Sequence, residues 1–419
     1  MRRGIEELQV AGKAGPPPRG DDDDGGGGAA LRDLQTEAKE LKATLGASAE
    51  GERRVEEQIE ELALALPNLS SAHTPSGSVP EVLEVVAGRR GSVAGPGRSH
   101  VDIGVELDLL DFAGAAATTG WGWYYLKNEA VLLEQALVQY AYSVCLGRGW
   151  KLVAPPSIVY SHVAAACGFQ PRDQNDEQQI YSIQQAEKDK AKPPLCLAAT
   201  AEIPLAGMNA GRILQEQDMP LKVVAASRCY RAEAGARGVD TKGLYRVHEF
   251  TKVEMFAWTM PDDHGDGNLG DSGVSHSEGV FEEMLEIQIE ILKALGLGFR
   301  VLEMPSTDLG ASASRKKDIE VYFPSRTKKD DGFGEVTSAS ICTDYQSRRL
   351  ATRVKKGTGQ LEWPHTVNGT ALAVPRVLAA VMEAGWNESD RTVLVPEVLR
   401  PWMGGMERIC NTLSRTKSA

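Results

Sequence analysis

Charged side chains and one aromatic ring are crowded into a short stretch of the chain. The stretch RCYRAEAGARGVDTKGLYRVHEFTKVEMF spans residues 228–256. The side chains in it that could take part in binding or catalysis are those of Arg231, Glu233, Arg246, His248, Phe250, Lys252 and Glu254. A hairpin in a protein core could not bury so many charges, and a solvated hairpin would not need them. The stretch therefore predicts a binding surface that offers cations, carboxylates and a flat ring.

The spacing of these residues predicts that most of them share one face of a β-strand, because alternate side chains of a strand point the same way. The expected set is Arg246, His248, Phe250, Lys252 and Glu254. At about 3.3 Å per residue the set extends roughly 13 Å from Phe250 to Glu254. We expect a base to stack on Phe250, phosphates to meet Arg231 and Arg246, and an ammonium or hydroxyl group to meet Glu254. The alternative is a solvated face of alternating charges, which would expose Phe250 without need.

The chain around this stretch is predicted to contain both helices and strands. Hydrophobic periodicity and Gly or Pro stops predict helices over 128–149, 280–296 and 370–384. Strands are predicted over 150–159, where Pro155 and Pro156 interrupt the pattern, and from residue 335, and short β runs dominate 195–256. This order predicts an α+β fold with a mainly antiparallel sheet flanked by helices.

The N-terminal part has a different character. Residues 11–28, AGKAGPPPRGDDDDGGGG, are of low complexity, and we expect residues 1–28 to be disordered. Apolar residues then recur at intervals of three and four over residues 31–66, with Glu, Lys and Arg between them. This pattern predicts a coiled-coil helix within residues 29–70 that needs a partner, and no second heptad segment is visible. Residues 71–99 are predicted to be a linker, and residues 100–419 one large domain.

Composition excludes several classes of protein. The chain of 419 residues is 42% hydrophobic and 25% charged, with a formal net charge of −12, which argues against a broadly basic surface. The six cysteines show no C-x-x-C and no His pair at ligand spacing, so we expect neither a disulfide framework nor zinc. No apolar run reaches the ~18 residues of a membrane span, and MRRGIEELQV lacks the apolar core of a secretory signal. We expect a soluble intracellular protein.

The opening stretch resembles motif 2 of the class II aminoacyl-tRNA synthetases, and in detail that of the seryl-tRNA synthetases. Further segments that resemble this family follow in the family's order: HVDIGVELDLLDF (100–112), WYYLK (123–127), TAEIPLAG (200–207), GEVTSASICTDYQSRRL (334–350), HTVNGTALAVPR (365–376) and VLVPEVLRPWM (393–403). The resemblance covers residues from about 60 to 403. It implies a class II catalytic domain over 100–419, which activates serine with ATP and transfers it to the 3′ end of serine tRNA. It also implies a homodimer, formed through a motif 1 that helix 128–146 and the following strand resemble.

The resemblance assigns roles to individual residues. The catalytic pair is Arg231, on the α-phosphate and the serine carboxylate, and Arg376, which covers the adenine and touches the γ-phosphate. ATP would be bound by Arg231, Ala232, Glu233, Val247, His248, Glu249, Phe250, Glu335, Val336, Thr337, Ser338 and Arg376. Serine would be bound by Thr200, Ala201, Glu202, Arg231, Glu254, Asn368 and Thr370. Mg²⁺ would be held by Glu335 and Ser338, because it prefers carboxylate and hydroxyl oxygens and bridges phosphates.

Within these sets the resemblance gives the serine pocket its detail. Glu254 and Thr370 would hold the serine hydroxyl, and Thr200 and Glu202, placed on one face of a predicted strand, would receive the amino group. Asn368 would lie near the hydroxyl or, alternatively, cap the helix predicted over 370–384. Glu233 would recognise the adenine amino group and Phe250 would stack on the base.

The sequence also departs from the family. Ala339 and Ile341 stand where the family commonly has Cys and Asn, so a polar contact beside the metal ligands is missing. Only the returning helix of the family's two-helix arm is recognisable, which implies either an incomplete gene product or altered tRNA recognition, and in either case weakened binding of serine tRNA.

Two other functions stay open. One is a paralogue that loads a small amino acid onto a carrier other than tRNA, and the other is a non-catalytic paralogue that binds tRNA or a protein. The segments KVEMF and EVTS resemble bacterial and organellar enzymes, so the expected location is the mitochondrion or the cytoplasm.

Overall fold

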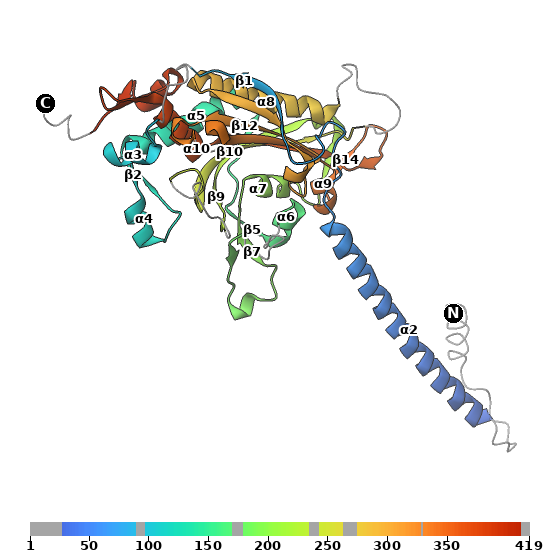
Figure 1. Ribbon diagram of the computed structural model, residues 1–419. Helices are drawn as coiled ribbons and strands as arrows, with labels where there is room; N and C mark the ends of the chain where they lie inside the picture. The colour runs from blue at the N-terminus through green and yellow to red at the C-terminus, as the bar shows by residue number, and fades with distance from the viewer. Residues whose placement is uncertain are drawn as a thin grey trace. The chain divides into compact units, whose positions relative to one another are not determined.

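The structure is a computed structural model that describes residues 27–88, 97–169, 179–233, 243–262, 275–327 and 330–411. The chain divides into two compact units, Met1–Leu66 and Pro67–Ala419. Its described α-helices, shown in Figure 1, are α2 (Gly27–Ala65), α3 (His100–Glu106), α4 (Phe112–Thr118), α5 (Glu129–Gly147), α6 (Ser161–Ala166), α7 (Glu202–Gly207), α8 (His276–Leu295), α9 (Tyr345–Arg349) and α10 (Val374–Gly385). The disorder predicted for residues 1–28 falls outside the described residues, except that Gly27 and Gly28 begin α2.

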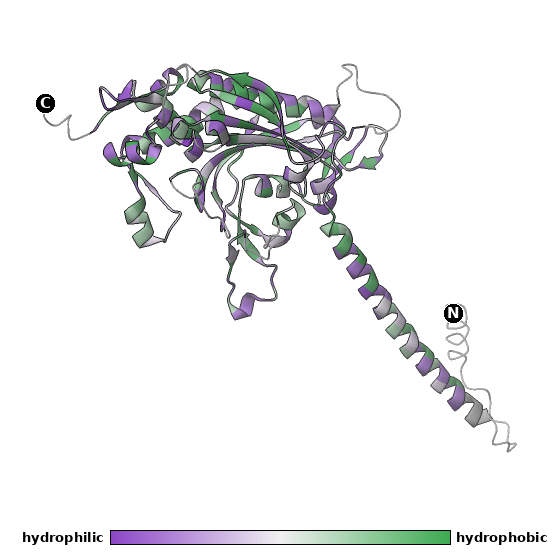
Figure 2. Cartoon of the chain, viewed as in Figure 1, coloured by the Kyte–Doolittle hydropathy of each residue, from purple (hydrophilic) through white to green (hydrophobic). Residues whose placement is uncertain are grey.

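The described part of the first unit is the single helix α2. Figure 2 shows hydrophilic and hydrophobic residues interleaved along it. The predicted seam residues are exposed: Leu34, Leu41, Leu45, Val55, Ile59, Leu62 and Leu66. A helix with an exposed apolar stripe gains little stability from its own surface, so the need for a partner helix remains a prediction.

The second unit is built on an eight-stranded sheet with the order β1-β11-β12-β13-β16-β10-β9-β4. The bounds in that order are Glu81–Val86, Phe299–Glu303, Arg315–Tyr322, Phe333–Thr343, His365–Ala373, Glu249–Thr259, Leu221–Tyr230 and Lys151–Leu152. Every neighbouring pair is antiparallel except β4 and β9, which are parallel. The predicted α+β fold with a mainly antiparallel sheet is confirmed.

The remaining strands form small sheets at the periphery. They are β15 (Leu361–Glu362), β14 (Arg353–Lys355) and β8 (Ile213–Gln215); β17 (Trp386–Asn387), β18 (Thr392–Leu394) and β19 (Arg408–Ile409); β2 (Leu110–Asp111) and β3 (Tyr125–Leu126); and β5 (Ile158–Tyr160), β7 (Leu195–Leu197) and β6 (Ser182–Ile183). The strand predicted over 150–159 is divided into β4 and β5, because Pro155 and Pro156 cannot donate to a ladder. Among the residues that the structure describes, no helix has the length and apolarity needed to cross a bilayer.

The two faces of β10 belong to two hydrophobic cores. Val253, Met255 and Ala257 join the core that contains the buried faces of α5, α8 and α10. Phe256 and Trp258 join the second core, with residues of α6 and α7. By strand alternation, Lys252 and Glu254 lie on the same face of β10 as Phe256 and Trp258. A strand that is buried on both faces therefore carries two charged side chains on one face.

The segment predicted to be a linker, residues 71–99, contains a strand. β1 pairs with β11 at the edge of the central sheet, with Glu81 opposite Glu303 and Val86 opposite Phe299. The linker prediction was wrong there, because EVLEVV lacks clear alternation and its ladder partner lies far away in the sequence.

The helix predicted over 370–384 begins four residues later. Thr370 to Ala373 complete β16, and α10 begins at Val374 with Pro375 in its first turn. A short buried apolar run such as TALA does not distinguish strand from helix by periodicity, which explains the error. The shift leaves Thr370 on the sheet rather than on the helix.

Candidate active site

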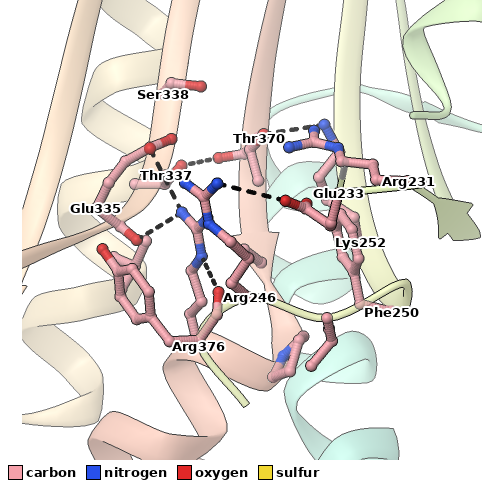
Figure 3. A pocket seen from close by; sticks show the side chains of 15 residues that line it. Arg231, Glu233, Arg246, Phe250, Lys252, Glu335, Thr337, Ser338, Thr370 and Arg376 are labelled. Carbon is pink, nitrogen blue, oxygen red and sulfur yellow. Dashed lines mark hydrogen bonds and ion pairs between the residues drawn. The ribbon is translucent and has the colours of Figure 1, made fainter. Parts of the chain in front are cut away.

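Side chains from three adjacent strands and the start of α10 surround a pocket over β13, β16 and β10 (Figure 3). Its lining consists of Arg231, Glu233, Tyr245, Arg246, Val247, Phe250, Lys252, Glu335, Val336, Thr337, Ser338, Thr370, Ala373, Pro375 and Arg376. Ten of these were predicted from the sequence as ATP or serine ligands. Residues more than a hundred positions apart therefore meet in one place.

The segment before β10 is not a strand. β10 begins at Glu249, and residues 243–248 form turns and bends, so the strand alternation predicted for Arg246 and His248 was wrong. As a result Tyr245, Arg246 and Val247 all line the pocket although they are consecutive. The prediction failed because alternation applies only where the backbone is extended in a ladder.

His248 and Glu249 do not line the pocket in this structure. The His248 ring stacks on Trp123, with ring centroids 5.7 Å apart, and its Nδ1 lies 2.9 Å from the Tyr181 hydroxyl. Glu249 accepts a hydrogen bond of 2.8 Å from Nε of Arg228. Their predicted roles in ATP binding rest on the resemblance alone, as does that of Ala232.

His100, from the HVDIG segment, holds the turn that carries Tyr245. Its Nε2 accepts from the Leu244 backbone N–H at 3.1 Å, so the ring proton lies on Nδ1, which is 2.8 Å from Oε1 of Glu383 in α10. All three groups are buried. This bridge links α3 and α10 to the segment that lines the pocket.

Arginine side chains dominate the end of the pocket predicted to bind the nucleotide (Figure 3). The Arg231 guanidinium lies over the Phe250 ring at 5.3 Å, and Nη1 of Arg246 lies 3.4 Å from a carboxylate oxygen of Glu233. Glu233 has a positive φ of 50°, a conformation that costs energy in a residue other than glycine and occurs often at functional sites.

Arg376 is fixed by contacts on three sides. Its Nε donates to the Tyr245 carbonyl at 3.0 Å and its Nη1 to the Glu335 carbonyl at 2.9 Å, and the guanidinium lies over the Tyr245 ring at 4.6 Å. Arg376 therefore contacts Tyr245 and Glu335, while the cation over Phe250 is Arg231.

The Glu335 carboxylate faces several cations. Burial raises its pKa, but the charges of Arg376, Lys316 and Arg231 outweigh burial, and the net effect is a pKa below the usual value. The nearest cation is Arg376, whose Nη1 lies 3.4 Å from Oε2. An ionised carboxylate surrounded by arginines is suited to phosphates that arrive with a divalent cation.

The oxygen atoms of Glu335 and Ser338 fit the predicted magnesium site. Both residues line the same pocket from β13, three positions apart. Across the described residues there is no group of three or more His, Cys, Asp or Glu side chains placed to hold a metal. Mg²⁺ bound with substrate phosphates needs only one or two carboxylates and retains water, so this pair is compatible with it.

A buried cluster lies at the other end of the pocket. Oε2 of Glu254 accepts from Nζ of Lys252 at 2.6 Å and from Oγ1 of Thr370 at 3.1 Å. Nζ of Lys252 also lies 3.3 Å from Oγ1 of Thr370. All three residues are buried, and Glu254 is 2% exposed. The cluster offers a fixed carboxylate and a hydroxyl to a small polar ligand.

Glu202 is a second buried carboxylate, close enough to Glu254 and Lys252 for their charges to act on it. It begins α7, whereas the sequence predicted that Thr200 and Glu202 share a strand; Oγ1 of Thr200 instead accepts from the Glu202 backbone N–H at 3.3 Å. Nε2 of Gln346 donates to Oε1 of Glu202 at 2.6 Å. Burial, followed by the nearby charge of Glu254, raises the pKa of Glu202 to about 7, although Lys252 opposes the shift.

Asn368 lies in the middle of β16, opposite Phe256 of β10 and Ser340 of β13. It therefore cannot cap a helix, and that alternative was wrong. A hydrogen bond from its side chain lowers the pKa of Glu202, which places Asn368 beside the second carboxylate.

Sequence reasoning gave several contributors no role. Lys252 was recognised as a cation of the surface but received no function, and the strand alternation expected around Arg246 put Tyr245 on the opposite face. Gln346, which orients Glu202, lies in the family-like segment CTDYQSRR but was not singled out. A buried glutamine carries no signal in a single sequence, whereas the burial of a lysine inside the apolar run KVEMFAW is a signal that could have been used.

Comparison with known proteins agrees with the site. Residues 181–385 match the family model described as the tRNA synthetase class II core domain (G, H, P, S and T). The mitochondrial serine–tRNA ligase of Saccharomyces cerevisiae is 44% identical over 358 residues, which cover 85% of this chain and 75% of the relative. The chain belongs to the seryl-tRNA synthetase family.

Two further seryl-tRNA synthetases extend this result. The serine–tRNA ligase of Rhodopirellula baltica is 41% identical over 379 residues, covering 89% of this chain and 83% of the relative. A seryl-tRNA synthetase of Pyrococcus horikoshii, solved in complex with ATP, superposes with a TM-score of 0.78 at 29% identity, covering 98% of this chain and 88% of that one. The class II synthetase fold predicted from the sequence is confirmed, and the chain is an aminoacyl-tRNA ligase of that class.

Proposed function

We propose that the chain is a serine–tRNA ligase that activates L-serine with ATP and transfers it to the 3′ end of serine tRNA. The observation that carries the proposal is the buried cluster of Glu254, Thr370 and Lys252 beside a pocket lined by Arg231 and Arg376. A small hydroxylated amino acid fits the cluster, and a nucleotide fits the arginine-rich end. The relatives at about 40% identity are named serine–tRNA ligases, which supports the same assignment.

In the first step, a carboxylate oxygen of serine forms a bond to the α-phosphorus while the bond from that phosphorus to the pyrophosphate oxygen breaks. Arg231 would hold both the serine carboxylate and the α-phosphate, and so align attack and offset the growing charge. Phe250 would stack on the adenine, and Glu233 would exchange its contact with Arg246 for the adenine amino group. Arg376, already fixed by Tyr245 and Glu335, would meet the departing phosphates.

In the second step, a hydroxyl of the terminal tRNA ribose attacks the serine carbonyl carbon, and the bond from that carbon to the oxygen of the AMP phosphate breaks. The hydroxyl proton passes to the departing AMP phosphate. Glu254 and Thr370 would hold the serine hydroxyl through both steps, and Glu202 with Thr200 and Asn368 would hold the amino group. None of these residues needs to form a covalent intermediate.

Glu335 and Ser338 would hold Mg²⁺ with the phosphates of ATP. Bound there, the ion would neutralise phosphate charge and favour departure of pyrophosphate. Glu335 also fixes Arg376, so its substitution should disturb both the metal and the arginine.

Location and assembly complete the proposal. We place the protein in the mitochondrion, because a relative at 44% identity is named mitochondrial. We also propose a homodimer, which motif 1 would form through α5 and the strands that follow it.

The test is serine-dependent exchange of pyrophosphate with ATP, followed by charging of total tRNA. A serine–tRNA ligase shows both reactions. Exchange with no charging at any tRNA concentration would favour a ligase for a non-tRNA carrier. Absence of exchange would favour a non-catalytic paralogue.

A further inference from the structure

Lys252 is a buried lysine that no role in the reaction accounts for. Its side chain is 9% exposed, lines the pocket, and contacts both groups proposed for the serine hydroxyl, Glu254 and Thr370. A buried ammonium is costly unless it is paired, and here its partner is a carboxylate that is itself almost completely buried. Lys252 therefore lines the pocket itself and joins it to the buried carboxylate of Glu254.

The charges around Lys252 do not balance among the protein's own side chains. Two buried carboxylates, Glu202 and Glu254, repel each other, and Lys252 is the ammonium that opposes both. Arg231 lies over Phe250, at the end proposed for the nucleotide, and is assigned to the serine carboxylate and the α-phosphate. When both carboxylates are ionised, one negative charge remains uncompensated beside Lys252, and the α-ammonium of an amino acid supplies the matching positive charge.

We propose that Lys252 is a specificity-determining positioning residue, which fixes the Glu254 carboxylate as a hydrogen-bond acceptor for the substrate hydroxyl. The proposal rests on the proposed function and names how that site selects serine. With Lys252 donating to one oxygen, Glu254 is held in one orientation and its negative charge is stabilised. Serine satisfies this acceptor with its hydroxyl, whereas alanine would leave it unpaired.

The main experiment substitutes Lys252→Met, which keeps much of the side-chain volume and removes the charge. We expect the KM for serine in pyrophosphate exchange to rise roughly 30-fold or more, as when one partner of a buried charge pair is lost, while the KM for ATP changes less than about threefold. The preference for serine over alanine should fall by a similar factor. An equal rise in both KM values would assign Lys252 to the nucleotide and overturn the proposal.

Lys222→Met is the matched control. Lys222 lies on β9, the neighbouring strand, and its Nζ is 2.9 Å from Glu283, but it does not line the pocket. This variant loses a comparable partly buried lysine–glutamate pair and should keep the parent KM for serine. A loss of serine affinity as large as that of Lys252→Met would make the effect a general one on the fold and would overturn the proposal.

A double-mutant cycle with Glu254→Gln tests the mechanism directly. If Lys252 acts through Glu254, adding Lys252→Met to the Glu254→Gln variant should raise the serine KM by less than about threefold. The double variant leaves no unpaired buried charge of this pair, so it remains informative if Lys252→Met alone does not fold. A full additional loss in the Glu254→Gln background would overturn the inference. The parent enzyme separates the two levels: without serine-dependent exchange the proposed function fails, whereas an active parent with an unaffected Lys252→Met variant refutes the role of Lys252 alone.

Discussion

At the scale of residues, two neighbouring buried carboxylates differ because their partners differ. Glu254 contacts a cation and a hydroxyl, Lys252 and Thr370. Glu202 receives amide hydrogen bonds from Gln346 and Asn368 and is raised in pKa by burial and by Glu254. One carboxylate is therefore a fixed acceptor and the other is able to change its charge near neutral pH.

The first prediction concerns Glu254. Glu254→Ala should lower kcat/KM for serine in pyrophosphate exchange by roughly 10³-fold or more, because the hydroxyl loses its buried acceptor. The KM for ATP should change far less, since Glu254 does not line the nucleotide end. Steady-state exchange with each substrate varied in turn measures both, and equal activation of serine by variant and parent would remove Glu254 from the site.

The second prediction is a pH dependence from Glu202. With a pKa of about 7, this side chain is largely protonated below neutral pH before serine binds, and the serine ammonium binds the ionised form. The KM for serine should therefore fall as pH rises through 7, by up to about tenfold per pH unit on the acidic side, while the KM for ATP does not follow.

The groups that face Glu202 allow this interpretation. They are Glu254, Lys252, Gln346 and Asn368, with the thiols of Cys167 and Cys342, whose pKa values are raised by burial. Glu202→Gln should show a raised but pH-independent KM for serine between pH 6 and 8. A parent enzyme with a flat profile over that range would contradict the assignment. Because the folded pKa is raised, the carboxyl also contributes stability that is present below about pH 4.5 and lost as pH rises through 7.

At the scale of elements, the sequence predicted which residues carry the chemistry better than how the backbone presents them. The family-like segments can be recognised by their residue types in a single sequence, so Arg231 and Phe250 of motif 2 and Glu335 of the segment 334–350 were found. The turn over 243–248 was not found, because a turn that is stabilised by distant side chains has no local pattern. Tyr245 was therefore placed on the wrong side, and its contact with Arg376 was missed.

The helical and strand boundaries show the same limit. Thr200 and Glu202 were expected on a strand, but the apolar run TAEIPLAG forms the short helix α7. Thr370 was expected on a helix, but it completes β16. Both runs are mostly apolar because they are buried, so their periodicity does not distinguish helix from strand, and packing decides between the two conformations.

The third prediction follows from the His100 bridge. His100→Ala removes two buried hydrogen bonds, to Leu244 and Glu383, and should destabilise the fold by about 1–3 kcal/mol per unpaired group. Because the released turn carries Tyr245, which holds Arg376, the KM for ATP should rise more than the KM for serine. Thermal unfolding and exchange kinetics measure the two effects. His73→Ala, at an exposed position, is the control, and an unchanged KM for ATP in a destabilised His100→Ala variant would limit the bridge to stability.

At the scale of the whole molecule, the second unit exposes apolar residues where motif 1 is expected to form a two-fold interface. Leu132 and Leu146 of α5, Leu152 of β4 and Ile158 of β5 are exposed. Symmetric dimers are the commonest oligomers, and such residues gain free energy when a second copy covers them.

The fourth prediction is therefore a homodimer. Light scattering at micromolar concentration should give about twice the chain mass of 45.2 kDa. Replacing Leu146 and Ile158 with Glu should shift the mass toward that of one chain and reduce exchange, because the motif 1 strand supports the active-site sheet. A parent that scatters as a single chain would contradict the prediction.

The last prediction separates the two units by activity. All residues assigned to adenylate formation lie between Thr200 and Arg376, in the second unit, so serine-dependent exchange should not depend on α2. Tight binding of a tRNA requires a rigid arm with basic side chains. In α2 the candidates are Arg32, Lys39, Lys42, Arg53 and Arg54. The acidic residues of the whole helix outnumber them, and the apolar seam is exposed.

We therefore expect near-normal exchange together with weak tRNA binding, strong sensitivity of that binding to salt, and slow charging. A version that carries a grafted two-helix arm should charge serine tRNA faster, because a paired seam makes the arm rigid and brings more basic groups, while its exchange rate stays the same. Filter binding of labelled serine tRNA at two salt concentrations, with charging and exchange measured on the same preparations, makes the comparison. If the chain charges tRNA as fast without the graft as with it, α2 alone is sufficient, and the need for a partner helix is refuted.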